Sequence, residues 1–183
     1  MNLINRMVSC IRDRGFRNLP EDERAGKIDE GALAILRKLN DEGKEAYVVG
    51  GCVRDLLMGL VPHDWDITTS ARPEETMAIA RAAGWKAVDG GGRRFGTVIV
   101  VRNGKNYEVT TFRKEFYGAD AHRPETVSFS DTLKEDVSRR DFTVNAMALD
   151  GDGCLYDYFH GLEDLEKKRL RTVGDAESRF NED

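Results

Sequence analysis

The sequence lacks any long uninterrupted hydrophobic run. No stretch approaches the roughly 20 consecutive apolar residues that a membrane-spanning helix requires. The hydrophobic and charged fractions, 40% and 33%, are typical of a soluble globular protein. Residues 1–10 contain Arg6 but no apolar core with a small-residue cleavage site, so they do not resemble a signal peptide. We therefore expect a cytoplasmic protein that has no membrane partner.

Cysteine is also scarce, and the chain has no excess of positive charge. The cysteines Cys10, Cys52 and Cys154 are odd in number, far apart and outside any C-x-x-C pattern, which argues against a disulfide framework and a zinc knuckle. The formal net charge of -5 is not that of a protein that grips nucleic acid over its whole surface. Any contact with nucleic acid is therefore expected to be local, or to lie outside this chain.

A chain of 183 residues is long enough for one domain with a hydrophobic core. From residue 29 onward, stretches of helical and strand periodicity alternate, with glycines at several helix ends. We expect helices at about 29–43, 53–59, 74–83 and 162–168, helical pieces within 133–149, and strands at 46–49, 66–69, 97–101, 107–112, near 155 and at 170–173.

Two turn signals refine this prediction. Asn103-Gly104 lies between two β-branched runs, so the strands on either side should form an antiparallel hairpin. Residues 113–130 are rich in charge and contain Gly118 and Pro124, which predicts a mobile loop. We interpret residues 1–28 as an N-terminal appendage and residues 29–173 as the domain body.

The stretch from Gly50 to Asp66 has the features of a phosphate site. Gly50 and Gly51 lack β-carbons at a helix start, so their N–H groups can approach a polyanion, and Arg54 adds a cation. Asp64 and Asp66 alternate on a strand-like run, which would place both carboxylates on one face. Hard oxygen ligands at this spacing suit Mg²⁺, which is usually held together with substrate phosphates.

Other polar residues extend this site. Glu108 on a neighbouring predicted strand is a candidate third metal ligand. Arg140, Asp141 and Asn145 bring charged and amide groups to a short helical turn, which suits a sugar and phosphates. Taken singly, each feature has a structural alternative: a glycine turn, a surface arginine, an exposed strand residue or a solvated face. A second Asp-x-Asp at residues 150–152 is flanked by glycines and is interpreted as a turn.

Five motifs in this order resemble the head domain of class II CCA-adding tRNA nucleotidyltransferases and bacterial poly(A) polymerases. The motifs are Gly50-Gly51-x-x-Arg54-Asp55, Asp64-x-Asp66, Tyr107 to Arg113, Arg139-Arg140-Asp141-Phe142-Thr143-x-Asn145-Ala146, and Arg171 to Asp183. The likeness covers about residues 29–183. It implies an α/β (α+β) nucleotidyltransferase fold related to DNA polymerase β, a mixed sheet flanked by helices, with residues 174–183 starting a truncated neck helix.

The resemblance also implies roles for individual residues. The catalytic, metal-binding carboxylates would be Asp64, Asp66 and Glu108, which would hold two Mg²⁺ ions. The residues that correspond to nucleotide-binding positions are Gly50, Gly51, Arg54, Arg140, Asp141, Asn145 and Asp183. Asp183 matches the first member of an Asp-x-x-Arg pair that recognises the base of CTP or ATP, and its arginine partner is missing here.

The implied reaction is the addition of the CCA end to tRNA. An RNA 3′-hydroxyl would attack the α-phosphate of CTP or ATP, with release of pyrophosphate. Three alternatives stay open: a poly(A) polymerase, a nucleotide-binding module without turnover, and a small-molecule nucleotidyltransferase of the same fold. The sequence indicates neither which nucleotides are added nor the oligomeric state.

Overall fold

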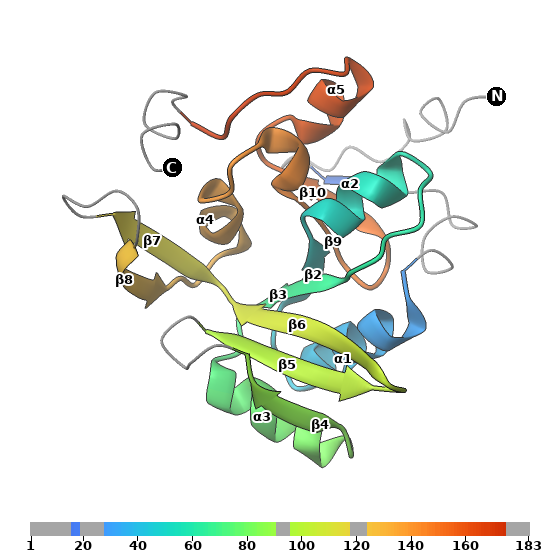
Figure 1. The fold of residues 1–183 in the computed structure, drawn as a ribbon, viewed down its shortest axis with the longest axis vertical. Coiled ribbons are helices and arrows are strands. Elements are labelled where there is room, and N and C mark those ends of the chain that lie inside the picture. The colour runs from blue at the N-terminus through green and yellow to red at the C-terminus, as the bar shows by residue number, and fades with distance from the viewer. Residues whose placement is uncertain (1–15, 19–27, 91–95, 118–123, 175–183) are drawn as a thin grey trace.

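The fold is built around one mixed sheet. The computed structural model describes residues 16–18, 28–90, 96–117 and 124–174. Within these residues, eight strands form the sheet in the order β1-β10-β9-β2-β3-β6-β5-β4 (Figure 1). The strands are β1 (Phe16–Asn18), β2 (Ala46–Val49), β3 (Asp66–Thr69), β4 (Lys86–Asp89), β5 (Thr97–Arg102), β6 (Lys105–Thr111), β9 (Met147–Leu149) and β10 (Cys154–Asp157).

The pairing of the strands explains why the sheet is mixed. β3 and β6 run parallel, whereas the other neighbouring strands pair antiparallel. β5 and β6 form the hairpin that the Asn103-Gly104 pair predicts. The parallel pair β3 and β6 lies in the middle of the sheet, and the aspartates and Glu108 lie at or near this pair.

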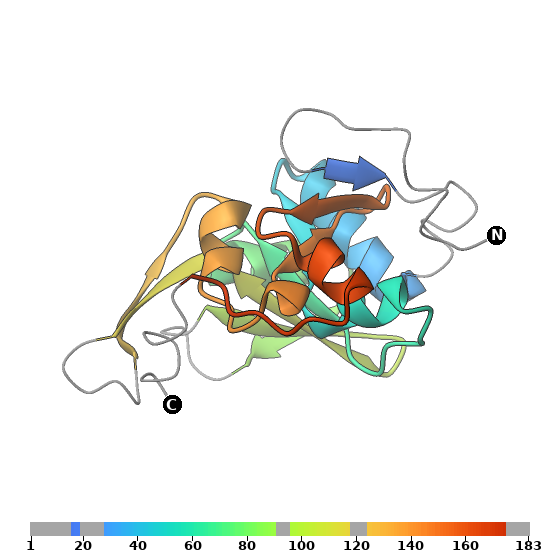
Figure 2. The same cartoon turned by 90° about the horizontal axis from the view of Figure 1, so that it is seen from above.

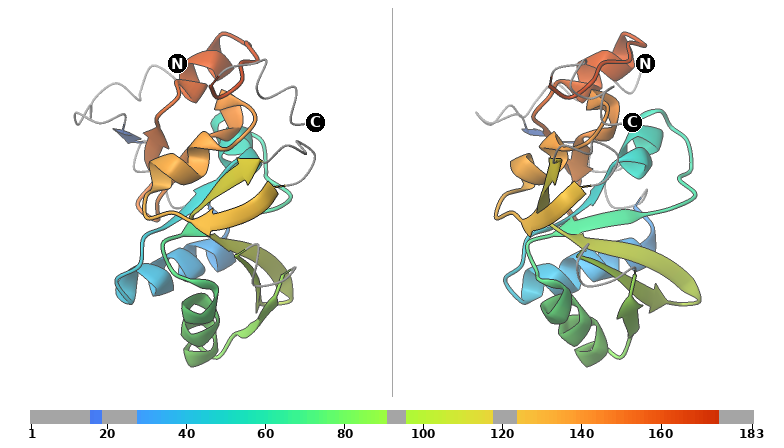
Figure 3. Two further views of the ribbon diagram at one scale, coloured as in Figure 1. Left: turned by 90° about the vertical axis from the view of Figure 1, so that its left-hand side faces the viewer. Right: turned by 60° about the vertical axis from the view of Figure 1, so that its left-hand side comes forward.

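Helices pack against the sheet in two separate hydrophobic cores. α1 and α3 contact each other and share one core with the sheet, whereas α4 packs with Tyr47, Val49 and Phe112 in a second core (Figure 1, Figure 3). The helices are α1 (Glu30–Asp41), α2 (Gly51–Leu57), α3 (Pro73–Ala82), α4 (Leu133–Ser138) and α5 (Gly161–Glu166), with a 3-10 helix at Thr143–Asn145.

α1 shows how the sequence specifies its elements. Apolar residues recur at helical spacing along α1, and the helix buries this face against the sheet. The carboxylate of Asp29 caps the helix by accepting a hydrogen bond from the Gly31 N–H at 2.9 Å. Burial acts to raise the pKa of Asp29, but hydrogen bonds from Lys105, Tyr107 and Gly31 together lower this pKa to about 2.

One prediction about the region after β6 was wrong. Instead of a mobile loop at 113–130, β7 (Arg113–Tyr117) and β8 (Pro124–Phe129) pair as an antiparallel ribbon, which projects from the body (Figure 2). The ribbon forms because backbone pairing does not require an apolar face. Because this stretch has many charged residues, its sequence lacks the apolar alternation by which strands are usually predicted.

Four further elements differ from the prediction. β1, within the segment predicted as an appendage, pairs with β10 at the edge of the sheet. Residues 147–149 form the central strand β9 rather than a helical piece, and the residues of β4 were not predicted as a strand. The stretch 170–173 forms a single isolated bridge, between Thr172 and Phe142, rather than a strand. The other predicted helices and strands are confirmed within one to a few residues. No helix among the described residues is both long and apolar enough to cross a membrane.

Candidate functional site

Two of the three predicted carboxylates lie side by side. Asp66 is the first residue of β3 and pairs in register with Glu108 of the parallel strand β6. Side chains of paired residues point to the same face of a sheet, and both side chains line one cavity of about 370 Å³. None of the hydrogen bonds found within the described residues reaches either carboxylate. Glu108 therefore faces the same side as Asp66, as the sequence predicted.

Asp64 lies close by but outside the strand. β3 begins at Asp66, so Asp64 belongs to the preceding loop and lines a second, neighbouring cavity of about 640 Å³. The expectation that both aspartates alternate along one strand was therefore wrong in detail. Burial raises the pKa of the Asp66 carboxyl, the charge of Arg140 opposes this rise, and the charge of Asp64 adds to it. Asp64 is thus close enough to act on Asp66 electrostatically.

The donor groups suit a hard divalent cation. Among the described residues, no three His, Cys, Asp or Glu side chains are grouped closely enough to hold a metal ion by themselves. Mg²⁺, however, is usually held by one or two carboxylates together with substrate phosphates. The pair formed by Asp66 and Glu108, with free oxygens in one cavity, fits that requirement. Three metal ligands, with Asp64 as the third, remain a prediction.

Arg140 adds a positive charge to the cavity that Asp66 and Glu108 line. It lines the same cavity as Asp66, together with Arg139. Burial lowers the pKa of the Arg140 guanidinium, and the charge of Arg139 adds to this effect. Its Nε atom is buried and has no hydrogen-bond partner within the described part of the chain. A cavity lined by both carboxylates and arginines can hold a metal-bound phosphate.

Gly50 makes room for Arg140. Gly50 has a φ of +85°, at the turn between β2 and α2. A β-carbon at this position would stand 2.7 Å from Nη1 of Arg140. The glycine is therefore required twice, by its backbone conformation and by the close approach of the guanidinium.

Arg54 joins two of the predicted nucleotide-binding segments. Its Nη1 donates a hydrogen bond to Oδ1 of Asn145 at 2.8 Å, and its Nε and Nη2 donate to Oδ1 of Asp55 at 3.0 and 2.8 Å. This contact connects α2 to the 3-10 helix, across 91 residues of sequence. The structure thus brings Arg54 and Asn145 together. Gly51 begins α2 one residue after Gly50.

The remaining predicted residues are only partly placed. Asp141 lines the cavity of Asp66 and Glu108, and its Oδ1 accepts a hydrogen bond from the N–H of Phe142 at 2.8 Å. Asp183 lies outside the described residues, so its predicted role in recognising the base has no structural test.

Two buried carboxylates support the site, and the sequence did not single them out. Asp136 is fully buried and accepts hydrogen bonds from Oγ1 of Thr68 at 2.9 Å and Nε of Arg139 at 3.2 Å. It therefore ties Arg139 to β3. Asp136 stands among charged residues in the sequence. No local pattern therefore distinguishes this buried carboxylate from an exposed one.

Asp164 plays the same part behind the 3-10 helix. It is fully buried and accepts hydrogen bonds from Oγ1 of Thr143 at 2.7 Å, Nε of Arg169 at 2.6 Å and Nε of Arg171 at 2.8 Å. A β-carbon at Gly161 would overlap the carbonyl oxygen of Thr143, so α5 packs directly against this turn. The 3-10 helix that carries Asn145 is therefore packed against α5.

Comparison with known proteins places this site in a family. Residues 46–171 match the model of the Poly A polymerase head domain. A CCA-adding enzyme of Streptococcus pyogenes serotype M2 (strain MGAS10270) is 55% identical over 152 residues, which is 83% of this chain and 37% of that enzyme. The chain therefore spans little more than a third of the length of this curated relative.

Solved structures agree with the sequence match. The crystal structure of the Bacillus stearothermophilus CCA-adding enzyme in complex with CTP superimposes with a TM-score of 0.73 at 47% identity, covering 83% of this chain and 35% of that one. A tRNA nucleotidyltransferase complexed with a primer tRNA and an incoming ATP analog gives 0.60 at 35% identity, over 76% and 38% of the two chains. With its mixed sheet, its five motifs and a family match across most of its body, this chain belongs to the Poly A polymerase head domain family.

Proposed function

We propose that this chain is the catalytic head of a tRNA 3′-terminal CCA-adding nucleotidyltransferase. It would transfer CMP and AMP from CTP and ATP to an RNA 3′-hydroxyl and release pyrophosphate. The observation that carries the proposal is the parallel register of Asp66 and Glu108, which puts both carboxylates into one cavity with Arg139 and Arg140. The 55% identity to a CCA-adding enzyme, and the complexes of structural relatives with CTP and with primer tRNA, support it.

Each residue has a part in this reaction. Asp66 and Glu108, with Asp64 beside them, would hold Mg²⁺. When bound there, Mg²⁺ would neutralise phosphate charge and favour ionisation of the attacking hydroxyl. Arg140, held against Gly50, would bind the triphosphate and compensate the charge that develops during transfer.

The contact of Arg54 with Asn145 would fix the two segments that hold the nucleotide relative to each other. Asp141, which lines the cavity, would accept a hydrogen bond from a hydroxyl group of the nucleotide's sugar. Four points stay predictions: these residue roles, the domain bounds at 28 and 173, the base contact of Asp183 and the cytoplasmic location.

The products distinguish CCA addition from its closest alternative. The purified chain is incubated with Mg²⁺ and a tRNA that lacks its terminus, with CTP alone, ATP alone or both nucleotides. We expect CTP to add two residues and ATP to be added only afterwards. Polymerisation of ATP on any RNA would reject CCA addition and favour a poly(A) polymerase.

A nucleotide-binding module without turnover is the second candidate. The match to the S. pyogenes relative covers 37% of that enzyme, so the similarity does not by itself assign turnover to this chain. Calorimetric titration with CTP and Mg²⁺ tests it beside the transfer assay. Binding of CTP without transfer to tRNA would establish the module, whereas transfer by the purified chain would exclude it.

A further inference from the structure

Two aromatic side chains lie on the other side of the sheet from Asp66 and Glu108. Trp65 stands between Asp64 and Asp66, and Tyr107 directly precedes Glu108. Trp65 and Tyr107 are 9% and 2% exposed, and both line the cavity of about 640 Å³. Because successive side chains on a strand point to opposite faces, Tyr107 packs behind Glu108 in β6, and Trp65 directly precedes the first residue of β3.

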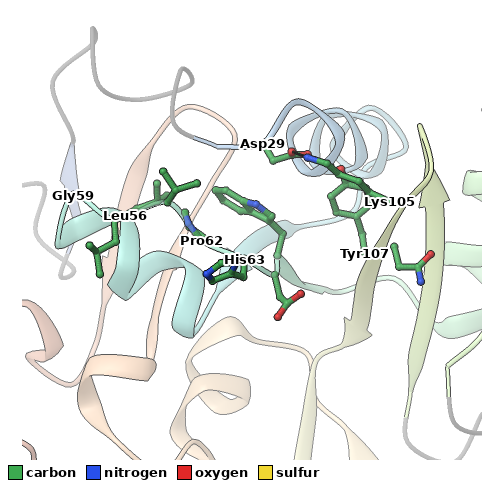
Figure 4. A pocket seen from close by; sticks show the side chains of 12 residues that line it. Asp29, Leu56, Gly59, Pro62, His63, Lys105 and Tyr107 are labelled. Carbon is green, nitrogen blue, oxygen red and sulfur yellow. Dashed lines mark hydrogen bonds and ion pairs between the residues drawn. The ribbon is translucent and has the colours of Figure 1, made fainter.

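Tyr107 is held by more than packing. Its hydroxyl donates a hydrogen bond of 2.5 Å to Oδ2 of Asp29, and Nζ of Lys105 lies 2.5 Å from Oδ1 of the same carboxylate (Figure 4). The carboxylate of Asp29 also caps α1 through the Gly31 N–H. Asp29 therefore joins the first turn of α1 to two residues at the beginning of β6. Hydrogen bonds to an ionised acceptor are the strong ones in proteins.

The packing at Gly31 limits how Tyr107 can move. A β-carbon at Gly31 would overlap the hydroxyl and the ring edge of Tyr107, so the tyrosine lies directly against the backbone of α1. The ring edge thus packs against the first turn of α1, and the hydroxyl bonds Asp29, which caps the same helix. Movement of the ring away from α1 would break the bond to Asp29.

This anchor lies at the beginning of β6. β6 starts at Lys105, directly after the Asn103-Gly104 turn, and Glu108 follows three residues later. On one side β6 pairs with β5 across that turn, and on the other side its register with β3 begins only at Glu108 and Asp66. β5 already pairs with β6 from Lys105 onward, with Ile99 opposite Glu108, and the contacts of Asp29 with Lys105 and Tyr107 add a second restraint just before the register with β3 begins.

We propose that Asp29 and Tyr107 are positioning residues that hold Glu108 in register beside Asp66. This inference rests on the proposed function, because it assigns Glu108 and Asp66 to one metal-binding pair. Tyr107 lines a different cavity from Asp66 and Glu108, so its role would be exerted through the backbone of β6. An error of about 1 Å in the position of a catalytic group is enough to lower a rate by ~10²-fold.

The substitution Tyr107→Phe tests the proposal, because it removes the hydroxyl and keeps the ring. The matched control is Tyr156→Phe. The Tyr156 hydroxyl donates to Oδ2 of Asp150 at 3.1 Å, at a half-buried position of β10 that is remote from β6 in the strand order. Both variants thus lose a tyrosine hydroxyl that bonds an aspartate, but only one of them lies behind a proposed metal ligand.

The readout is the binding of Mn²⁺ alone to the 183-residue chain, followed by electron paramagnetic resonance. We expect Tyr107→Phe to raise the Mn²⁺ dissociation constant about tenfold, the low end of the effect of residues that orient metal ligands. Asp29→Asn, which keeps an acceptor but loses the charge, should give a smaller rise in the same direction. Tyr156→Phe should leave the dissociation constant unchanged. In the transfer assay the loss should appear in kcat rather than in KM for CTP.

Glu108→Gln separates failure of the inference from failure of the proposed function. If Glu108→Gln weakens Mn²⁺ binding and Tyr107→Phe does not, the positioning role is wrong and the metal pair stands. If Tyr107→Phe and Tyr156→Phe weaken Mn²⁺ binding equally, the cause is general destabilisation of the fold. That result would also overturn the inference. If Glu108→Gln itself binds Mn²⁺ as wild type does, the proposed site is wrong. Should Tyr107→Phe fail to fold, Asp29→Asn provides the same comparison.

Discussion

At the scale of single residues, the site depends on the space that Gly50 leaves free. A β-carbon at this position would stand 2.7 Å from Nη1 of Arg140, and the charge of Arg140 opposes the rise in the pKa of Asp66. The glycine therefore allows the guanidinium of Arg140 to lie close to the turn before α2. A helix start with two glycines indicates a polyanion site in general terms, and the sequence alone does not reveal that a distant arginine needs this space.

Gly50→Ala should impair both folding and nucleotide binding. The new methyl group adds strain at positive φ, about 1–2 kcal/mol, and displaces Arg140. Gly43→Ala is the matched control, because Gly43 has a similar φ of +74° with nothing within 4 Å of the added β-carbon. Urea unfolding should show a loss for both variants, whereas calorimetric titration with CTP should show weaker binding only for Gly50→Ala. Equal CTP affinity for the two variants would remove Arg140 from the nucleotide site.

Asp29 should make the stability of the fold sensitive to acid. Its folded-state pKa of about 2 lies below its ordinary value of 3.8, so its contribution is complete above about pH 4 and is lost as the pH falls through 2. The full contribution is about 2 kcal/mol. The difference in unfolding free energy between wild type and Asp29→Asn should therefore shrink by about 1 kcal/mol from pH 6 to pH 3. Urea unfolding measures this difference, and a constant value over that range would contradict the pKa of Asp29.

At the scale of elements, predictions were accurate where periodicity is long and poor where it is short. α1 and α3 were predicted because their apolar residues recur over several turns and because a glycine follows each helix. β9 was missed because Met147-Ala148-Leu149 is a short apolar run without β-branched residues, which local pattern cannot distinguish from a helix. These residues form a strand because they pair with β2 on one side and β10 on the other.

The 3-10 helix at Thr143–Asn145 should depend on Asp164 of α5. Asp164→Ala leaves Thr143 and two arginines without their shared acceptor, which should destabilise the fold by about 3 kcal/mol. Glu163→Gln is the control on the same helix, because Glu163 is exposed and pairs only with surface cations. Thermal unfolding of the two variants makes the comparison, and an Asp164→Ala variant as stable as Glu163→Gln would show that α5 does not support the turn.

At the scale of the whole molecule, the family and the fold were predictable because the five motifs occur in one order. The assembly of the site was less predictable. The pairing of Asp66 with Glu108 depends on β3 and β6 being parallel neighbours, and no local signal encodes a parallel pair 42 residues apart in sequence. The supports Asp136 and Asp164 were missed for the same reason, because their partners come from distant segments.

The most direct measurement is single-turnover addition of CMP to a tRNA that lacks its terminus, by wild type, Glu108→Gln and Asp152→Asn. Asp152 is the matched control, because it is an exposed carboxylate in the other Asp-x-Asp sequence, where Asp150 caps a turn. We expect Glu108→Gln to lower the rate by at least ~10²-fold, since the protein contributes mainly position and charge to such a reaction. Asp152→Asn should transfer CMP at the wild-type rate. Wild-type transfer by Glu108→Gln would contradict the assignment of Asp66 and Glu108 as the catalytic pair.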